Sequence, residues 1–393
     1  FISKINKSCK VKIRQKKFEA FKIWWFSFFL EGKSQLGEIM CIAVFMWEAH
    51  PLYPFLLFLN RDEYHSSPTT LLGVSRPTEP LGWWEGGEIL GGRDGEAGGT
   101  WLAFSRDGRL AFITNVRELQ SIPRAKSRGH LPVRFLQIST SPCEALQDWK
   151  GQLKLVPSFF NCQSKDYMGS CLGKLLGPIR YLNRVHSSIL QLDVFHFGGD
   201  KFHQEILRSW VLIIFQSKKK PIEFAEEVVK EANEYNGFNL ILIDLCSKSM
   251  VYVTNRPKEN GNFVTEVSPG IHVLSNASLN SPWPKAQRLG HSFKEVLARY
   301  GEDELPLKET VAELLMDRTK DDSSMLPGIF PPEVEYHLSS IYIDVSRPQG
   351  RYGTRNQSAL SVKSNGEVCF HERYLEKDLW KEQTVTYQIE MAK

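Results

Sequence analysis

The stretch GEIMCIAVFMWEAHPLYPFLLFLNRDEYHSSP, from Gly37 to Pro68, decides how this chain is interpreted. Ile42–Phe45 and Phe55–Leu59 are short apolar runs typical of buried strands. A Met-Cys pair, Met40-Cys41, stands directly before the first run, and Asn60–Glu63 (NRDE) directly follows the second. We expect a strand to hold Cys41 at the end of a sheet, with the charged NRDE residues close by.

Residues 1–39 differ in composition from everything that follows. They contain nine Lys or Arg and three Asp or Glu, so their net charge is +6. Because the whole chain has a net charge of +4, the remaining residues sum to −2. We expect them to be translated leader sequence outside the folded core, with Met40 as the start of the mature protein. A targeting or regulatory extension is the alternative. Their apolar run, Ile23–Leu30, is far shorter than a membrane span.

The composition excludes some classes of protein. A nucleic-acid-binding protein needs a basic face on its folded part, which a charge of −2 does not supply. The seven cysteines are odd in number and include no CxxC pair, so they indicate neither a zinc ribbon nor a c-type haem. The histidines show no HExxH spacing, and no motif requires a cofactor. Haem stays open without a motif that indicates it, and no metal is expected.

The rest of the chain alternates between helical and strand patterns. Helices are predicted after Pro221, over Pro284–Tyr300 and over Glu309–Met316. The Asp107-Gly108 pair predicts a hairpin, and the glycines between Gly82 and Gly99 predict turns. Further strands are predicted at Phe238–Leu245, Met250–Thr254, Gly270–Ser275, Ser358–Val362, Val368–Glu372 and Thr384–Glu390. Residues 138–215 lack such a pattern, so we expect an insertion there, either retained intron sequence or a lid domain.

Cys41 has the chemistry of an N-terminal nucleophile if Met40 is removed. One residue would then supply a thiol and a free α-amine, whose pKa of ~7.7–8.0 suits a base at neutral pH. Arg61 would favour the thiolate, and Asp62 would orient the amine. Asn115 and Asn276 each follow an apolar strand and could stabilise an oxyanion. Arg355 would pair with a substrate carboxylate or with Asp62. The alternatives are a buried apolar cysteine, a structural Arg61–Asp62 ion pair and turn-capping asparagines.

Several motifs in order resemble the NRDE family, also named for transport and Golgi organisation protein 2. These motifs are Met40-Cys41, Asn60–Glu63, Ala97–Trp101, Ile113–Asn115, Tyr235–Ile241, Leu274–Asn276 with Pro282-Trp283, and Tyr352–Arg355. The resemblance covers Met40 to about Glu390 and departs from the family at 1–39 and 138–215. It implies an α/β fold of the α+β kind, a four-layer αββα sandwich like that of N-terminal-nucleophile hydrolases, with Cys41, Arg61, Asp62 and Asn276 in the active-site positions.

The same resemblance implies a role in Golgi organisation, protein secretion, and haem or lipid handling, in the cytoplasm or in association with Golgi or mitochondrion. The alternative is a cysteine amidase or acyl transferase that acts on a small acylated substrate through its C–N bond. The expected partner is a small-molecule or lipid-like ligand, with no nucleic acid and no transmembrane span. The residues do not indicate the ligand, whether catalysis occurs, or the oligomeric state.

Overall fold

The computed structural model describes residues 40–65, 78–84, 87–95, 97–137, 219–256, 261–347 and 350–389. The predicted leader at 1–39 lies outside the described residues, as does the predicted insertion at 138–215. All helices and strands given below belong to one unit of the chain.

The first sheet has the strand order β10-β1-β2-β12-β13-β14, and β11 pairs with β12. Its strands are β1 (Met40–Trp47), β2 (Phe55–Tyr64), β10 (Gly270–Leu274), β11 (Asp344–Arg347), β12 (Gly350–Val362), β13 (Glu367–Glu376) and β14 (Leu379–Gln388). Every pairing in it is antiparallel. The chain therefore brings its first described strands beside its last ones, at the centre of this sheet.

The second sheet follows chain order, from β3 to β9. Its strands are β3 (Thr78–Trp84), β4 (Ile89–Asp94), β5 (Leu102–Ser105), β6 (Arg109–Asn115), β7 (Phe238–Asp244), β8 (Ser249–Thr254) and β9 (Val264–Glu266). The glycine-rich segment is therefore partly strand, where the sequence predicted turns. Glycine is needed here because a Cβ at Gly91 or Gly92 would meet Ala103 or the Trp101 ring of the same sheet.

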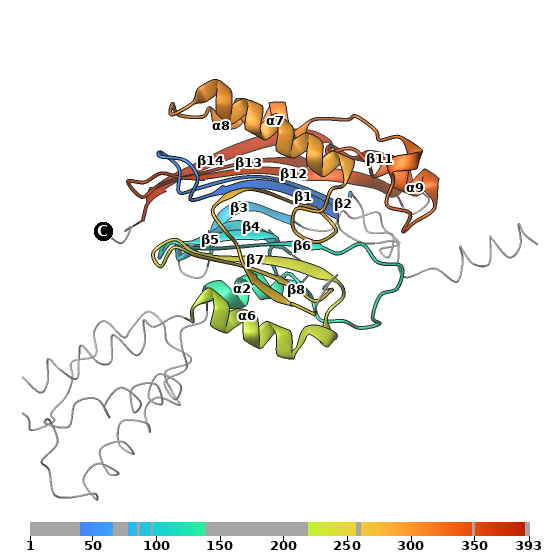
Figure 1. Cartoon of the computed structure of the whole chain (residues 1–393), viewed down its shortest axis with the longest axis horizontal. Helices are drawn as coiled ribbons and strands as arrows, with labels where there is room; N and C mark the ends of the chain where they lie inside the picture. The colour runs from blue at the N-terminus through green and yellow to red at the C-terminus, as the bar shows by residue number, and fades with distance from the viewer. Residues whose placement is uncertain are drawn as a thin grey trace, which may run out of the picture. The chain divides into compact units, whose positions relative to one another are not determined.

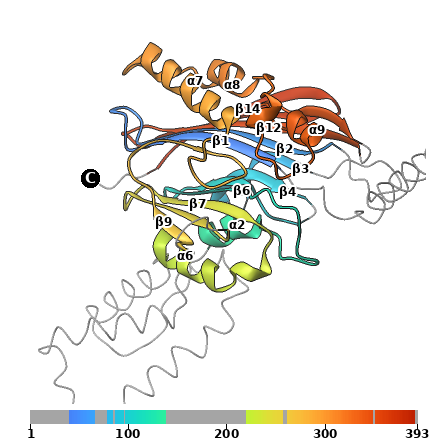
Figure 2. The same ribbon diagram turned by 45° about the vertical axis from the view of Figure 1, so that its right-hand side comes forward.

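Helices cover the outer faces of both sheets, so that the layers run helix, sheet, sheet, helix (Figure 1). Helices α7 (Pro284–Tyr300) and α8 (Leu307–Leu315) cover the first sheet, and α2 (His130–Gln137) and α6 (Pro221–Lys230) cover the second. The turned view in Figure 2 shows the same layers. The predicted four-layer αββα sandwich is confirmed. A short helix, α9 (Pro332–His337), and two 3-10 turns, η3 (Ala232–Glu234) and η4 (Ser323–Met325), complete the described elements.

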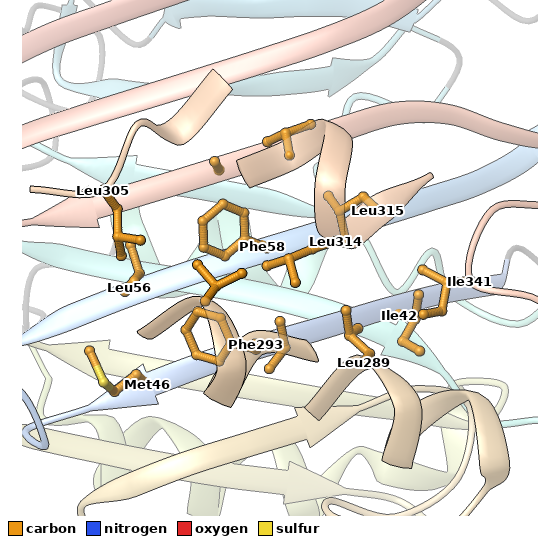
Figure 3. Packing of buried hydrophobic residues seen from close by; sticks show 14 of the residues in the cluster. Ile42, Met46, Leu56, Phe58, Leu289, Phe293, Leu305, Leu314, Leu315 and Ile341 are labelled. Carbon is orange, nitrogen blue, oxygen red and sulfur yellow. The ribbon is translucent and has the colours of Figure 1, made fainter. Parts of the chain in front are cut away.

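Two apolar layers hold the sandwich on either side of the first sheet. Towards the helices, Ile42 and Phe58 pack with Leu289 and Phe293 of α7 (Figure 3). Towards the second sheet, Phe45 of β1 meets Phe112 of β6 edge to face, with ring centroids 5.4 Å apart. Because strand side chains alternate between faces, even-numbered residues of β1 face the helices and odd-numbered ones face the second sheet.

Candidate functional site

The pairing of β1 with β2 positions the first four candidate residues. Cys41 lies opposite Arg61, and Met40 lies opposite Asp62. On the other side of β2, Asn356 of β12 pairs with Arg61 and Thr354 pairs with Asp62, with a bulge at the residue between them. All these positions are buried. The register alone therefore places the Met-Cys pair, the NRDE residues and the YGTR segment side by side.

The first sheet separates the candidate residues onto its two faces. Cys41 is four residues before Phe45 on β1, so its side chain lies on the same face of the sheet, towards the second sheet. Arg61, its partner on β2, lies beside it on that face. Asp62 is four residues after Phe58 on β2, so its side chain faces the helices, next to that of Met40. The structure thus brings Cys41 together with Arg61, and it directs the Asp62 carboxylate to the opposite face.

Arg61 is held in the space between the two sheets. Its guanidinium lies over the ring of Trp101, 4.2 Å from the centroid. Its Nη2 is 3.3 Å from Oε2 of Glu63, and its Nη1 donates to Oδ1 of Asn356 at 3.4 Å. A guanidinium that stacks on an indole and pairs with a buried carboxylate is fixed in orientation. Arg61 therefore presents a buried, oriented positive charge next to Cys41.

A second buried carboxyl group, Glu372 of β13, continues this polar chain. Its Oε1 accepts from Nδ2 of Asn356 at 3.3 Å, and its Oε2 accepts from the backbone N of Leu81 at 2.8 Å. Burial raises the pKa of Glu372 to about 7, against the hydrogen bonds and the charge of Arg61, which lower it. The polar chain from Arg61 to Leu81 therefore links the two sheets through groups that were not predicted as site residues.

Burial is the main influence on the pKa of the Cys41 thiol. Burial, followed by the negative charge of Asp62, raises its pKa to about 12, although Arg61 and the Asp62 backbone N–H act in the opposite direction. Arg61 thus has the predicted effect on Cys41, but desolvation is larger. Met40 is joined to Cys41, and its backbone N donates to the Tyr352 hydroxyl at 2.9 Å. In this form the chain has neither a thiolate nor a free α-amine at Cys41.

On the helix side, Asp62 uses one of its two carboxylate oxygens. Its Oδ1 accepts from the Thr354 hydroxyl at 2.7 Å, whereas its buried Oδ2 has no hydrogen-bond partner among the described residues. Burial raises the pKa of Asp62, and the positive charge of Lys285 opposes this. Lys285 is the second residue of α7, and its Nζ donates to the carbonyl of Leu338 at 3.1 Å. Asp62 and Lys285 are therefore a buried, electrostatically linked acid and amine.

The two candidate asparagines lie on neighbouring segments beside Cys41. Nδ2 of Asn276 donates to the backbone carbonyl of Asn115 at 2.9 Å. The Ser275 hydroxyl donates to the Cys41 carbonyl and to Oδ1 of Asn276, each at 3.3 Å. One amide proton of Asn276 is thus used to join β6 to the end of β10. The contact to Cys41 comes from Ser275, and the oxyanion role of Asn115 and Asn276 stays a prediction.

Arg355 occupies the bulge of β12. Its Nη1 donates to the carbonyl of Tyr64 at 3.2 Å. The hydrogen bond that reaches Asp62 from this strand comes from Thr354. The YGTR segment therefore contacts Asp62 through Thr354, and the predicted pairing of Arg355 with a substrate carboxylate or with Asp62 stays a prediction.

A small surface pocket lies next to Lys285. Its volume is about 230 Å³, including its open mouth, and its lining residues are Arg117, Trp283, Pro284, Lys285, Asp321, Met325, Leu326, Pro327, Glu335, Leu338 and Ser339. Neither Lys285 nor this pocket was predicted from the sequence. A signal was present, because Lys285 stands four and eight residues before Leu289 and Phe293, on the apolar face of α7.

The acidic residues of the pocket are already paired. Glu335 accepts backbone N–H groups from Gly328, Ile329 and Phe330 at 2.7–3.0 Å, and it lies 3.5 Å from Nη1 of Arg117. Asp321 pairs with Arg288. Arg117 also lies over the Trp283 ring, 4.7 Å from the centroid. These ion pairs form the polar part of the pocket lining.

The pocket does not fit haem. Sites for drug-sized ligands have volumes of roughly 300–1,000 Å³, whereas the space that this pocket encloses is about 10 Å³, room for roughly one water molecule. Its lining has neither histidine nor cysteine, and of its side chains only the Met325 thioether is a haem-iron ligand. Elsewhere in the part of the chain that the structure describes, no three His, Cys, Asp or Glu side chains gather as a metal site. None of the described helices is long and apolar enough to cross a membrane.

Comparisons with known proteins agree with the motif order. The Transport and Golgi organisation 2 family model matches residues 40–163 and 200–377. The mouse Transport and Golgi organization 2 homolog is 27% identical over 365 residues, and the human homolog is 27% identical over 368. Each alignment covers 89% of this chain and 99% of the relative.

Solved structures of a conjugated bile acid hydrolase from Clostridium perfringens also match. One of them covers 89% of this chain and 98% of its own, at 9% identity and a TM-score of 0.32. The family is shown by the family model, which matches most of the chain in the region that contains the motifs. This chain belongs to the Transport and Golgi organisation 2 family.

Proposed function

We propose that this chain serves in Golgi organisation and protein secretion by binding a small lipid-like ligand, without cleaving an amide bond. The first part follows from the names of its relatives. The lack of amide cleavage rests on one observation, the burial of Cys41, which is 2% exposed and whose pKa is raised by that burial.

A cysteine hydrolase needs a thiolate. Burial raises the pKa of Cys41 to about 12, which disfavours the thiolate at neutral pH. A base for this thiol is also lacking at its own α-nitrogen, which is part of the peptide bond to Met40. The residue instead contributes to the packed layer between the sheets, with Arg61 beside it.

The pocket next to Lys285 supports a lipid-like ligand. Trp283, Met325, Leu326 and Pro327 give it apolar walls, and ion pairs form the polar part of its lining. This combination suits one end of an amphiphile, whose apolar body contacts the apolar side chains while its polar atoms meet the charged ones. The enclosed space is about 10 Å³, room for roughly one water molecule, so such a ligand would bind along the surface at the mouth of the pocket.

Complementation tests both parts of the proposal. In cells that lack the endogenous family member, Cys41→Ala should restore Golgi structure and secretion as well as the wild-type chain does. Met325→Glu should fail, because it places a charge in the pocket at a side chain that is 59% exposed and so does not carry the fold. Leu379→Glu is the matched control, since Leu379 is 68% exposed and is not among the residues that line the pocket. Failure of a folded Cys41→Ala chain would overturn the proposal.

One observation favours a second function, an N-terminal-cysteine amidase. The thiol of Cys41 lies beside an oriented guanidinium, and Ser275 and Asn276 lie at its carbonyl. This function requires a chain that begins at Cys41, whose new α-amine would lie near the Tyr352 hydroxyl that now accepts from Met40. A thiol-reactive amide mimic should then label this trimmed chain, and Cys41→Ala should abolish the label. An unlabelled trimmed chain that remains folded would exclude the amidase.

A further inference from the structure

Strand β14 forms one edge of the first sheet, and its outer side is open. It pairs with β13 alone among the described strands, and no hydrogen bond within the described chain involves its outer backbone groups. The other edges are short, bulged or covered. Asn280 donates to the Val273 carbonyl of β10 and accepts from its N–H, the bulged β3 bonds through Leu81 to side chains of β13 and β14, and β9 has three residues. The long open edge of the described sheets is therefore β14.

The hairpin that leads into β14 shows which of its backbone groups face outward. The turn residues Lys377 and Asp378 both have positive φ, and Glu376 pairs with Leu379 across this two-residue turn. A pair that closes such a turn exchanges both backbone hydrogen bonds, and bonded and non-bonded pairs then alternate along an antiparallel ladder. Every second residue of β14 therefore presents a free N–H and a free carbonyl to the outside. These residues are Trp380, Glu382, Thr384, Thr386 and Gln388.

The composition of this edge suits further pairing. Residues 383–388 (QTVTYQ) contain no charge, proline or glycine, and Thr, Val and Tyr favour strands. Native proteins blunt open edges with charged residues, prolines or bulges, because free backbone groups are a template for another strand. The charged residues Lys381 and Glu382 precede this run, and each is paired within the chain. The second half of β14 therefore has none of these protections.

Side-chain contacts on both faces fix β14 in position. On the face towards the second sheet, the ring of Tyr387 packs edge to face on Trp83, with centroids 4.9 Å apart. On the other face, the Thr384 hydroxyl lies 2.8 Å from Nδ1 of His371. A strand that is already ordered loses little conformational freedom when it pairs with another.

We propose that two copies of this chain pair along β14, antiparallel and about a two-fold axis at Thr384, so that the first sheet of one copy continues into that of the other. The outward residues are spaced evenly about Thr384, so this register is the one that uses all of them. Across the axis, Thr384 meets Thr384, Glu382 meets Thr386, and Trp380 meets Gln388.

The occupant is a second copy because this edge is complementary to itself. An axis at Thr384 places no like charges opposite each other, whereas an axis at Glu382 would oppose two carboxylates. The axis is normal to the sheet, so the helix-facing side of one copy continues that of the other. The inference does not depend on the proposed function, since no residue of β14 lines the pocket.

The mass of the full chain in solution tests the pairing. Multi-angle light scattering at increasing concentration should show that a monomer becomes a dimer. Thr384→Pro should remain a monomer, because it removes an outward N–H without removing a hydrogen bond to β13. Thr384→Val is the matched control, since both variants lose the hydroxyl next to His371 but valine keeps the N–H, and it should dimerise.

Two outcomes would overturn the inference. A wild-type chain that stays monomeric would leave the edge to a strand of another protein. A folded Thr384→Pro chain that dimerises as well as the wild type would place the interface elsewhere.

Two charge variants test the register and leave the backbone unchanged. In the proposed dimer Thr386 lies opposite Glu382 of the other copy, and both positions are exposed in the single chain, so substitution there should not disturb the fold. Thr386→Lys should tighten the dimer and Thr386→Glu should weaken it. Their dissociation constants should differ by about tenfold or more, because each dimer contains the pair twice. Equal dissociation constants would overturn the register at Thr384.

Discussion

At the scale of single residues, the pKa of the Cys41 thiol depends on two opposing effects, burial and the charges nearby. Arg61, directly across from Cys41, lowers the pKa of the thiol, whereas loss of solvent and the charge of Asp62 raise it. The net effect is a pKa of about 12, because desolvation raises the pKa more than the Arg61 guanidinium lowers it. The same guanidinium also interacts with Glu63, Asn356 and Trp101. Proximity of a cation to a cysteine is therefore not sufficient for activation.

Arg61 itself should be important for stability. Arg61→Met removes the charge that pairs with buried Glu63 and the guanidinium over Trp101, so it should cost roughly 3 kcal/mol of unfolding free energy. Arg299→Met is the matched control, because its partner Glu313 lies 2.8 Å away at the surface, where a pair contributes less than about 1 kcal/mol. Urea denaturation of both variants gives the comparison. Equal losses would contradict the buried position of Arg61.

Glu372 should make stability depend on pH. Its pKa rises from the ordinary 4.5 to about 7 in the fold, so the folded chain holds a proton that the unfolded chain releases. The associated stability is present below pH 4.5 and is lost as pH rises to about 7, with a total of roughly 3 kcal/mol. Glu372→Gln should reduce this loss when urea denaturation is compared at about pH 5 and pH 8. The exposed Glu226→Gln control should not, and a variant as pH-dependent as the wild type would refute this role.

At the scale of elements, the YGTR segment shows why one glycine is needed. A Cβ at Gly353 would overlap the backbone carbonyl of Ile343 on the neighbouring segment. That carbonyl accepts the Thr354 N–H at 2.8 Å, and the Thr354 hydroxyl in turn donates to Asp62. The close approach at Gly353 therefore orients the residue that holds Asp62.

Gly353→Ala should consequently destabilise the chain by about 2 kcal/mol or more, because a backbone atom cannot move aside as a side chain can. Gly82→Ala is the control, since its nearest neighbour to an added Cβ is the Pro80 carbonyl at 3.7 Å, an ordinary contact. Its cost should stay within about 0.5 kcal/mol. Thermal unfolding of the two variants measures the difference, and a neutral Gly353→Ala would show that the two segments are not in contact.

The elements themselves were predictable where local signals were strong. Helix α7 spans Pro284–Tyr300, as its proline start and apolar period predicted. Strand β12 begins at Gly350, eight residues before the predicted Ser358, because its polar first half is buried by pairing with β2 rather than by apolar side chains. Strand β4 was not predicted, because its glycines are typical of turns. In the fold, Gly91 and Gly92 leave space for the backbone at Leu102 and for the Trp101 ring.

At the scale of the whole molecule, the candidate site depends on pairings between distant segments. The sequence predicted that Cys41, Arg61 and Asp62 lie close together, and in the register of β1 and β2 Cys41 lies opposite Arg61, next to Asp62 on the same strand. It did not predict that Arg61 and Asp62 face opposite sides, because the strand was expected to end at Leu59. Strand β2 runs to Tyr64, so the alternation of strand side chains extends through the NRDE residues.

Local sequence patterns could not predict the surroundings of Lys285, because they too depend on pairing between distant segments. Its position on the apolar face of α7 could be predicted from the sequence. Asp62, whose charge acts on Lys285, lies 223 positions earlier, on β2. Only the packing of α7 against the first sheet brings the amine and Asp62 into electrostatic contact. A site assembled across a helix and a sheet in this way becomes visible only in the folded chain.

The titration of Cys41 tests the central claim most directly. The ultraviolet absorbance of thiolate is measured against pH for the wild-type chain and for Cys41→Ala, so that the other cysteines cancel in the difference. A thiol whose pKa is about 12 predicts no difference between the two chains from about pH 6 to about pH 9. A thiolate that is lost in Cys41→Ala and titrates below about pH 8 would contradict the account and support a cysteine nucleophile.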